Sequence, residues 1–235
     1  MDLEIKVLMQ ADAAGRLLQE LPMHKLTPEL GAAAREVFDN ALEARDGDTA
    51  IPAGLLAATI YDAIGDQTNR VLNLVDVLQV KFMVANTVPE YEDVRSKALF
   101  VLGLADKAKA PLLAFYSIVI AADSAFFAAE AADNSPAWII TTLGDLTTAC
   151  GRAKGIEKDF YFVKFVDLLA SAVNMAMYRV FAEKDQPQID LLLTSIAQKV
   201  DDLVPPDFEF PDNPQQTAKI AAILASLTDK YASQS

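Results

Sequence analysis

Histidine and cysteine are almost absent from this chain of 235 residues, which contains one of each, His24 and Cys150. Zinc sites and ferritin-like di-iron sites draw on several histidine or cysteine ligands, so neither centre is expected here. One cysteine cannot form an intrachain disulfide, which fits a reducing compartment. We therefore expect a cytoplasmic protein with no cofactor, in which His24 lies in a turn and Cys150 is a small packed residue.

Positive charge is also scarce, because 20 Lys and Arg residues face 33 Asp and Glu residues, giving a net charge of −13. Such a surface repels nucleic-acid phosphates, so we expect no nucleic-acid partner. The chain lacks a long apolar run as well. The longest nearly apolar stretch, 110–122, covers about 13 residues, whereas a membrane span needs about 20. The sequence thus predicts a soluble protein with no membrane span.

Strand patterns are missing, and apolar residues instead recur at spacings of three and four, as in amphipathic helices. Short connections between helices favour antiparallel neighbours. We therefore predict an all-α fold, an antiparallel multi-helix bundle or helical-hairpin array of about nine to ten helices. The expected helices cover about 2–20, 28–45, 52–64, 66–84, 89–106, 110–132, 136–151, 156–184, 187–203 and 214–231.

Helix boundaries are marked by proline, glycine and capping residues. Thr27 and Ser135 each precede a proline, which is typical of a helix start, and 87–90 matches a capping box. Helices are expected to stop near three glycines. These glycines are Gly47, Gly65 and Gly155. From this pattern we predict a helical domain over 1–203, an extended acidic connector over 204–213, and a C-terminal helix in 214–235.

One fragment resembles a known repeat. Ala34, Phe38, Ala41 and Leu42, followed by Asp46, are similar to the second helix of a tetratricopeptide repeat. The preceding helix lacks the family's pattern, and no second copy follows at a spacing of 34 residues. We therefore interpret the fragment as an ordinary amphipathic helix.

The expected helix 156–184 carries a polar stripe at alternating spacings of three and four, which places its members on one face. This stripe is a candidate ligand or partner surface, although a solvated helix face would show the same pattern. Asp123 lies in the most apolar helix, where a buried carboxylate must be paired or neutralised. We predict that Asp123 meets the stripe, with Asn174 or Arg179 as partner; the alternative is an outward-facing or structurally paired carboxylate. The stripe comprises Lys164, Asp167, Ser171, Asn174 and Tyr178.

The C-terminal helix carries an apolar stripe that could fold onto its own bundle or dock into a partner's groove. Its residues are Ile220, Ile223, Leu224, Leu227 and Tyr231. Aromatic residues are concentrated between 100 and 181, which predicts the main core there. Alanines beside large rings could also leave a cavity for an apolar molecule.

Two pairs of acidic residues could bind Mg²⁺. Asp62 and Asp66 share the spacing of the Asp-rich motifs of isoprenoid synthases, and Glu90 with Asp93 is similar to the acidic pairs of all-α nucleotide pyrophosphohydrolases. The companion motifs of both families are missing, and Asp66 and Glu90 also fit helix starts. The sequence does not say whether the four carboxylates meet, and no metal site is assigned.

These observations lead to three functional predictions. The first is a non-catalytic interaction or scaffold protein that assembles with a protein partner or with itself. The second is a carrier of an apolar ligand, a lipid or pigment, within helices 110–184. The third is a Mg²⁺-dependent carboxylate enzyme on a helical bundle. Whether the protein is an enzyme stays open, and the absence of a visible nucleophile, base or metal cluster favours binding.

Overall fold

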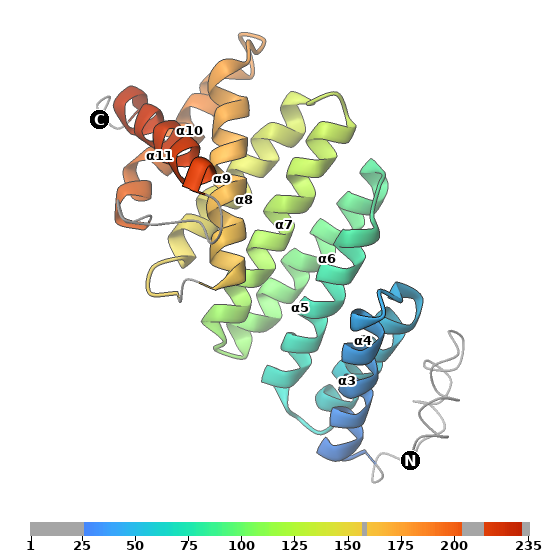
Figure 1. The fold of residues 1–235 in the computed structure, drawn as a ribbon. Coiled ribbons are helices and arrows are strands. Elements are labelled where there is room, and N and C mark those ends of the chain that lie inside the picture. Colours follow the sequence, from blue (N-terminus) through green and yellow to red (C-terminus); the bar gives the residue numbers. More distant parts are fainter. Residues whose placement is uncertain (1–25, 157–158, 204–213, 232–235) are drawn as a thin grey trace. The chain divides into compact units, whose positions relative to one another are not determined.

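The structure is a computed structural model that describes residues 26–156, 159–203 and 214–231 (Figure 1). Within these residues it contains nine helices and no strands, and 84% of the residues are helical. The predicted all-α multi-helix fold is therefore confirmed. The expected helix 2–20, His24 and the connector 204–213 lie outside the described residues.

The helix bounds follow the sequence pattern closely. In chain order they are α3 Pro28–Glu43, α4 Gly47–Ala63, α5 Gln67–Val84, α6 Val88–Lys107, α7 Pro111–Ala131, α8 Pro136–Arg152, α9 Phe160–Tyr178, α10 Gln186–Leu203 and α11 Pro214–Tyr231.

Two predicted boundaries are wrong. The helix expected over 156–184 is shorter at its C-terminus, because α9 ends at Tyr178 and Arg179 adopts an extended backbone. The helix expected over 52–64 begins earlier, because Gly47 is the first residue of α4 and does not end a helix, and Arg45 adopts the left-handed conformation in the turn before it. In the next turn Gly65 fills the corresponding position with φ of +82°, as predicted.

Side-chain caps explain where several helices begin. Thr27 accepts a hydrogen bond from Leu30 N, and Asp66 accepts one from Asn69 N at 3.0 Å. The carboxylate of Glu90 accepts bonds from Asn86 N and Thr87 N, both at 3.0 Å, at the start of α6. These contacts satisfy backbone donors that have no partner within the helix.

The described chain forms parts of two compact units. Of the described residues, 26–85 and 97–114 form the N-terminal unit, and 86–96, 115–156, 159–203 and 214–231 form the C-terminal unit. Helices α6 and α7 therefore contribute residues to both units, and α8 to α11 belong to the C-terminal one. The predicted domain boundaries at 203 and 213 stay a prediction.

In the N-terminal unit, α4 packs between α3 and α5 (Figure 1). Gly54 on α4 allows this close approach, because a Cβ there would lie 2.4 Å from Val77 Cγ2 and 2.9 Å from the Phe38 ring. The fragment that resembles a repeat helix contributes Ala34, Phe38 and Ala41 to this core. The fragment therefore buries one apolar face, as an amphipathic helix does.

The core of the C-terminal unit is built around aromatic residues of α7 and α9. Phe115, Phe162 and Phe165 are buried, and the Phe115 and Phe165 rings meet edge to face with centroids 5.5 Å apart. The sequence correctly placed these rings in a core. It misplaced Phe160 of α9, which is 67% exposed; Tyr178, a member of the polar stripe, is 74% exposed. In the N-terminal unit Phe100 is also exposed.

Two described helices, α7 and α9, are long and apolar enough to cross a membrane by length and composition alone. In α7 the apolar window extends beyond the nearly apolar run 110–122, because it covers 18 residues. That window is 78% buried inside the fold, and the window of α9 is 50% buried. Core helices meet the same criteria, so these two helices are weak indicators of a membrane span.

Candidate functional site: a pocket between α7, α9 and α11

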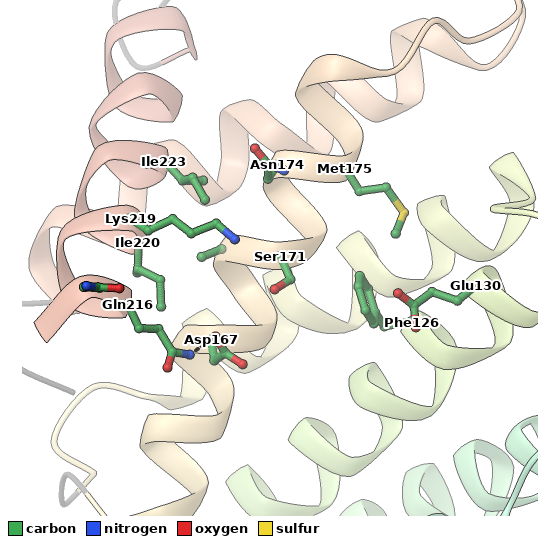
Figure 2. Close-up of a pocket in the computed structure, with 12 residues that line it drawn as sticks. Phe126, Glu130, Asp167, Ser171, Asn174, Met175, Gln216, Lys219, Ile220 and Ile223 are labelled. Carbon is green, nitrogen blue, oxygen red and sulfur yellow. Dashed lines mark hydrogen bonds between the residues drawn. The ribbon is translucent and has the colours of Figure 1, made fainter. Parts of the chain in front are cut away.

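The C-terminal unit contains a pocket of about 730 Å³ where α9 passes between α7 and α11 (Figure 2). We refer to it as the α7–α9–α11 pocket. Its lining residues are Phe126 and Glu130 from α7; Asp167, Ala170, Ser171, Asn174 and Met175 from α9; and Gln215, Gln216, Lys219, Ile220 and Ile223 from α11.

The polar stripe predicted on α9 is divided by this geometry. Asp167, Ser171 and Asn174 line the pocket. Lys164 instead contacts Asp123 on α7, and Tyr178 projects from the end of the helix with most of its surface exposed. The middle of the stripe therefore faces a concave site rather than a flat solvated surface.

The apolar stripe predicted on α11 forms the opposite wall and the packing beneath it. Ile220 and Ile223 line the pocket, whereas Leu224, Leu227 and Tyr231 are buried in the unit. The Tyr231 hydroxyl donates a hydrogen bond of 3.1 Å to Asp190 on α10. The stripe thus folds onto its own bundle, and docking of these residues with a partner stays a prediction.

A side-chain hydrogen bond joins the two helices at the edge of the pocket. Gln216 Nε2 on α11 donates to Asp167 Oδ1 on α9 at 2.6 Å (Figure 2). Charge-assisted bonds of this kind are stronger than neutral ones, so this contact helps to hold α11 in place. Gln216, Lys219 and Glu130 also line the pocket and were not predicted from the sequence. Gln216 and Lys219 precede Ile220 and Ile223 by four positions, a spacing that could have placed them beside the apolar stripe.

Asp123 does meet the stripe, but through a residue other than those predicted. Lys164 Nζ lies 2.5 Å from Asp123 Oδ2, and among the described residues no hydrogen-bond donor otherwise reaches that buried oxygen. Arg179 donates instead to the backbone oxygen of Asp133, and Asn174 lines the pocket. Lys164 lies nearer the start of α9, on the part of the helix that packs against α7.

The surroundings of Asp123 raise the pKa of its carboxyl above the ordinary value. Burial raises the pKa of Asp123, and the charges of Asp167 and Glu130 raise it further, while Lys164 acts in the opposite direction. Three carboxylates thus influence one another beside the pocket. This arrangement makes an anionic ligand without a compensating positive group electrostatically unfavourable there.

A second, partly buried ion pair in the C-terminal unit had no sequence signal. Arg95 binds Asp145 with two hydrogen bonds of 2.7 and 3.0 Å. Burial raises the pKa of Asp145, and the Arg95 contact acts against that rise. The residues lie 50 positions apart, so no local spacing links them. The pair connects α6 to α8 and lies outside the pocket lining.

The carboxylates of the magnesium hypothesis have structural contacts. Asp62 accepts a bond of 2.7 Å from Arg70, Asp66 caps α5, and Glu90 caps α6. In the described part of the chain, no group of three His, Cys, Asp or Glu side chains is arranged to hold a metal ion. Asp93 is exposed near the start of α6. Cys150, predicted to be a small packed residue, is buried, and burial raises the pKa of its thiol to about 12.

No protein-family model, curated protein or solved structure matches this chain. The chemistry of the pocket lining is therefore the basis for a functional proposal. That lining combines an apolar surface with amide, hydroxyl and charged groups, which suits a molecule that has both apolar and polar parts.

Proposed function

We propose that this protein is a binding protein whose C-terminal unit holds a small molecule in the α7–α9–α11 pocket. The observation that carries the proposal is the pocket itself, at about 730 Å³, which lies within the range of roughly 300–1,000 Å³ typical of small-molecule sites. Three helices from distant parts of the sequence supply its walls. The proposal keeps the carrier hypothesis and extends its site from helices 110–184 to α11.

The lining supports an amphipathic ligand rather than a purely apolar lipid or pigment. Phe126, Met175 and Ile220 offer apolar surface, and Ser171 and Asn174 offer hydrogen-bonding groups on α9. Burying a ligand without polar groups would leave such side chains without water and without a partner, which costs free energy. A ligand that satisfies both kinds of surface is bound more favourably.

The side chains that could act as a nucleophile or as metal ligands have structural roles, which supports a binding function. Cys150 is a neutral, buried thiol, because its pKa of about 12 leaves almost no thiolate near neutral pH. The carboxylates of Asp66 and Glu90 accept hydrogen bonds that cap helices. These roles support a binding function more than the magnesium-dependent enzyme.

A blocked pocket tests this proposal. The variant Ser171→Trp places a large ring in the pocket, and Ser226→Trp is its matched control on the exposed side of α11, outside the lining. The wild-type chain and both variants are incubated with a cellular small-molecule extract, desalted, and analysed by native mass spectrometry. We expect the same bound mass on the wild type and on Ser226→Trp, and its loss from Ser171→Trp.

The outcome contradicts the proposal if Ser171→Trp retains the bound mass, because the molecule then binds elsewhere. The proposal is also contradicted if the wild type retains no molecule from extracts of several sources. Circular dichroism of the two variants confirms that each keeps the helical fold, so that a loss of binding is not a loss of structure.

A second candidate function is the interaction or scaffold role. Its specific support is a set of large apolar side chains that the C-terminal unit leaves exposed, among them Val180 at 94% and Leu191 at 69%. Light scattering during gel filtration tests self-assembly. If the chain is a dimer that Leu191→Glu converts to a monomer, self-assembly through α10 is supported; a wild-type monomer at all concentrations contradicts it.

A further inference from the structure

Two opposite charges line the α7–α9–α11 pocket without forming an ion pair. Lys219 lies on α11 and Glu130 on α7, and among the described residues neither side chain has an ion-pair or hydrogen-bond partner. Figure 2 shows Lys219 extending from α11 toward Asn174 and Ser171 on α9, whereas Glu130 lies on the other side of α9. The pocket therefore presents a positive group and a negative group on separate walls.

We propose that the ligand of this pocket is zwitterionic, with a carboxylate that binds Lys219 and an ammonium group that binds Glu130. A short peptide with free ends is a molecule of this class. The inference rests on the proposed binding function and adds the chemical class of the ligand. One molecule of this kind would pair both lining charges at once.

Ligands with a single charge fit the lining less well. A carboxylate alone could pair with Lys219 but would face the negative charges of Glu130 and Asp167. An amine alone could pair with Glu130 but would lie opposite Lys219. Asp167 is already held by Gln216, which leaves Glu130 as the freer carboxylate of the two.

The remaining lining suits the body of a short peptide. Asn174 and Gln215 carry amides that can both donate and accept, and Ser171 carries a hydroxyl; these groups match peptide N–H and C=O. Phe126 and Met175 offer surface for apolar side chains. A volume of about 730 Å³ is large enough for a ligand of several residues rather than a single small ion.

Calorimetric titration of the full chain with trileucine tests the ligand class. The comparison peptides are its N-acetylated form, its C-amidated form and the form blocked at both ends. We expect trileucine to bind, and each single block to weaken binding roughly two- to fivefold, as for exposed charge contacts, because Glu130 and Lys219 are both exposed. Loss of either charge should matter, because each end has its own partner.

Two variants test which lining charge binds which end of the peptide. Lys219→Met should bind trileucine and its C-amide equally well, while still distinguishing the N-acetylated form. Glu130→Gln should show the reverse pattern. The controls are Lys154→Met and Glu183→Gln, which change exposed charges outside the lining and should keep the wild-type preferences. A general loss of structure would not produce these two complementary patterns.

The inference is overturned if trileucine does not bind, if the doubly blocked peptide binds as tightly as the free one, or if both variants keep the wild-type preferences. In each case the extract experiment with Ser171→Trp remains decisive for the binding function. A molecule lost from that variant would show that the pocket binds a ligand of another class. Retention by that variant would refute the binding function itself.

Discussion

Lys164 Nζ lies 2.5 Å from Asp123 Oδ2, and this contact joins α9 to α7 inside the C-terminal unit. The Asp123 side chain is 6% exposed and the Lys164 side chain 18% exposed, so water solvates neither group well. An ion pair in such a position is costly to break from one side, because the remaining charge stays buried. It positions the segment of α9 that precedes the pocket lining.

Removal of the Lys164 ammonium should destabilise the protein. Lys164→Met leaves the Asp123 carboxylate without its ion-pair partner, and we expect the free energy of unfolding to fall by about 2 kcal/mol. The double variant Asp123→Leu/Lys164→Met should recover most of that loss, since it buries no charge. Urea denaturation followed by circular dichroism measures both. Equal stability of Lys164→Met and the wild type would contradict this account of the pair.

The Asp123 carboxyl should give the protein a measurable pH dependence. Burial raises the pKa of Asp123 above its ordinary value of 3.8, so the folded state binds this proton more tightly than the unfolded state. The group's stabilising contribution is therefore fully present below about pH 3.8 and is lost as the pH rises through the raised folded-state pKa. Burial also raises the pKa of Asp145 and of Asp76, so their contributions to stability change with pH in the same direction.

Comparison with Asp123→Asn isolates this effect, because the other carboxyls are common to both proteins. The stability of the wild type minus that of Asp123→Asn should decrease as the pH rises from 4 to 7. Each unit of pKa difference between the two states corresponds to about 1.4 kcal/mol. Denaturation curves at several pH values provide the measurement, and a difference that stays constant or increases with pH would refute the assigned direction.

Substitution by alanine should change the free energy of unfolding in opposite directions at Gly54 and Gly103. A Cβ at Gly54 would meet Val77 at 2.4 Å, whereas nothing lies within 4 Å of a Cβ at Gly103 on α6. Gly54→Ala should lower the unfolding free energy by about 1 kcal/mol, because overpacking exceeds the gain in helix propensity. Gly103→Ala should raise it by about 0.5–1 kcal/mol. Thermal denaturation distinguishes them; stabilisation by both substitutions would contradict the packing at Gly54.

Cys150 should be inert in the native protein. The thiol is 2% exposed, and burial raises its pKa to about 12. Alkylation by iodoacetamide at pH 8 should be slower than for an ordinary exposed cysteine by about a thousandfold or more, since the thiolate is the reactive form. Denaturation in guanidinium should restore the ordinary rate. Rapid labelling of the folded chain would show that the α8 core opens readily.

Sequence patterns were sufficient for the helices, because caps and apolar spacing act over a few residues. Thr27, Asp66 and Glu90 begin their helices with the contacts that their positions predict. The end of α9 was missed because the residues after Tyr178 continue an apolar pattern that the extended backbone at Arg179 interrupts. Phe160 was assigned to a core by its ring alone, although it begins α9 and is largely exposed.

The pocket could be predicted only in part. The α9 stripe gave Asp167, Ser171 and Asn174, but its meeting with α11 depends on tertiary packing that no local spacing encodes. The contact of Asp123 with α9 was predicted, but its partner was not, because Lys164 rather than Asn174 or Arg179 lies on the turn of α9 that faces Asp123. The two lining charges, Glu130 and Lys219, resemble any surface charges in the sequence and gain a role only from their shared pocket.

Methyl-selective nuclear magnetic resonance tests the binding pocket most directly. The labelled full chain is titrated with the small-molecule extract, and the methyl signals of Met175 on α9 and of Ile220 and Ile223 on α11 are followed. We predict that these signals shift together, with one concentration dependence, while the buried Ile60 of the N-terminal unit is unchanged. Unchanged pocket signals, with shifts confined to other parts of the chain, would contradict the account.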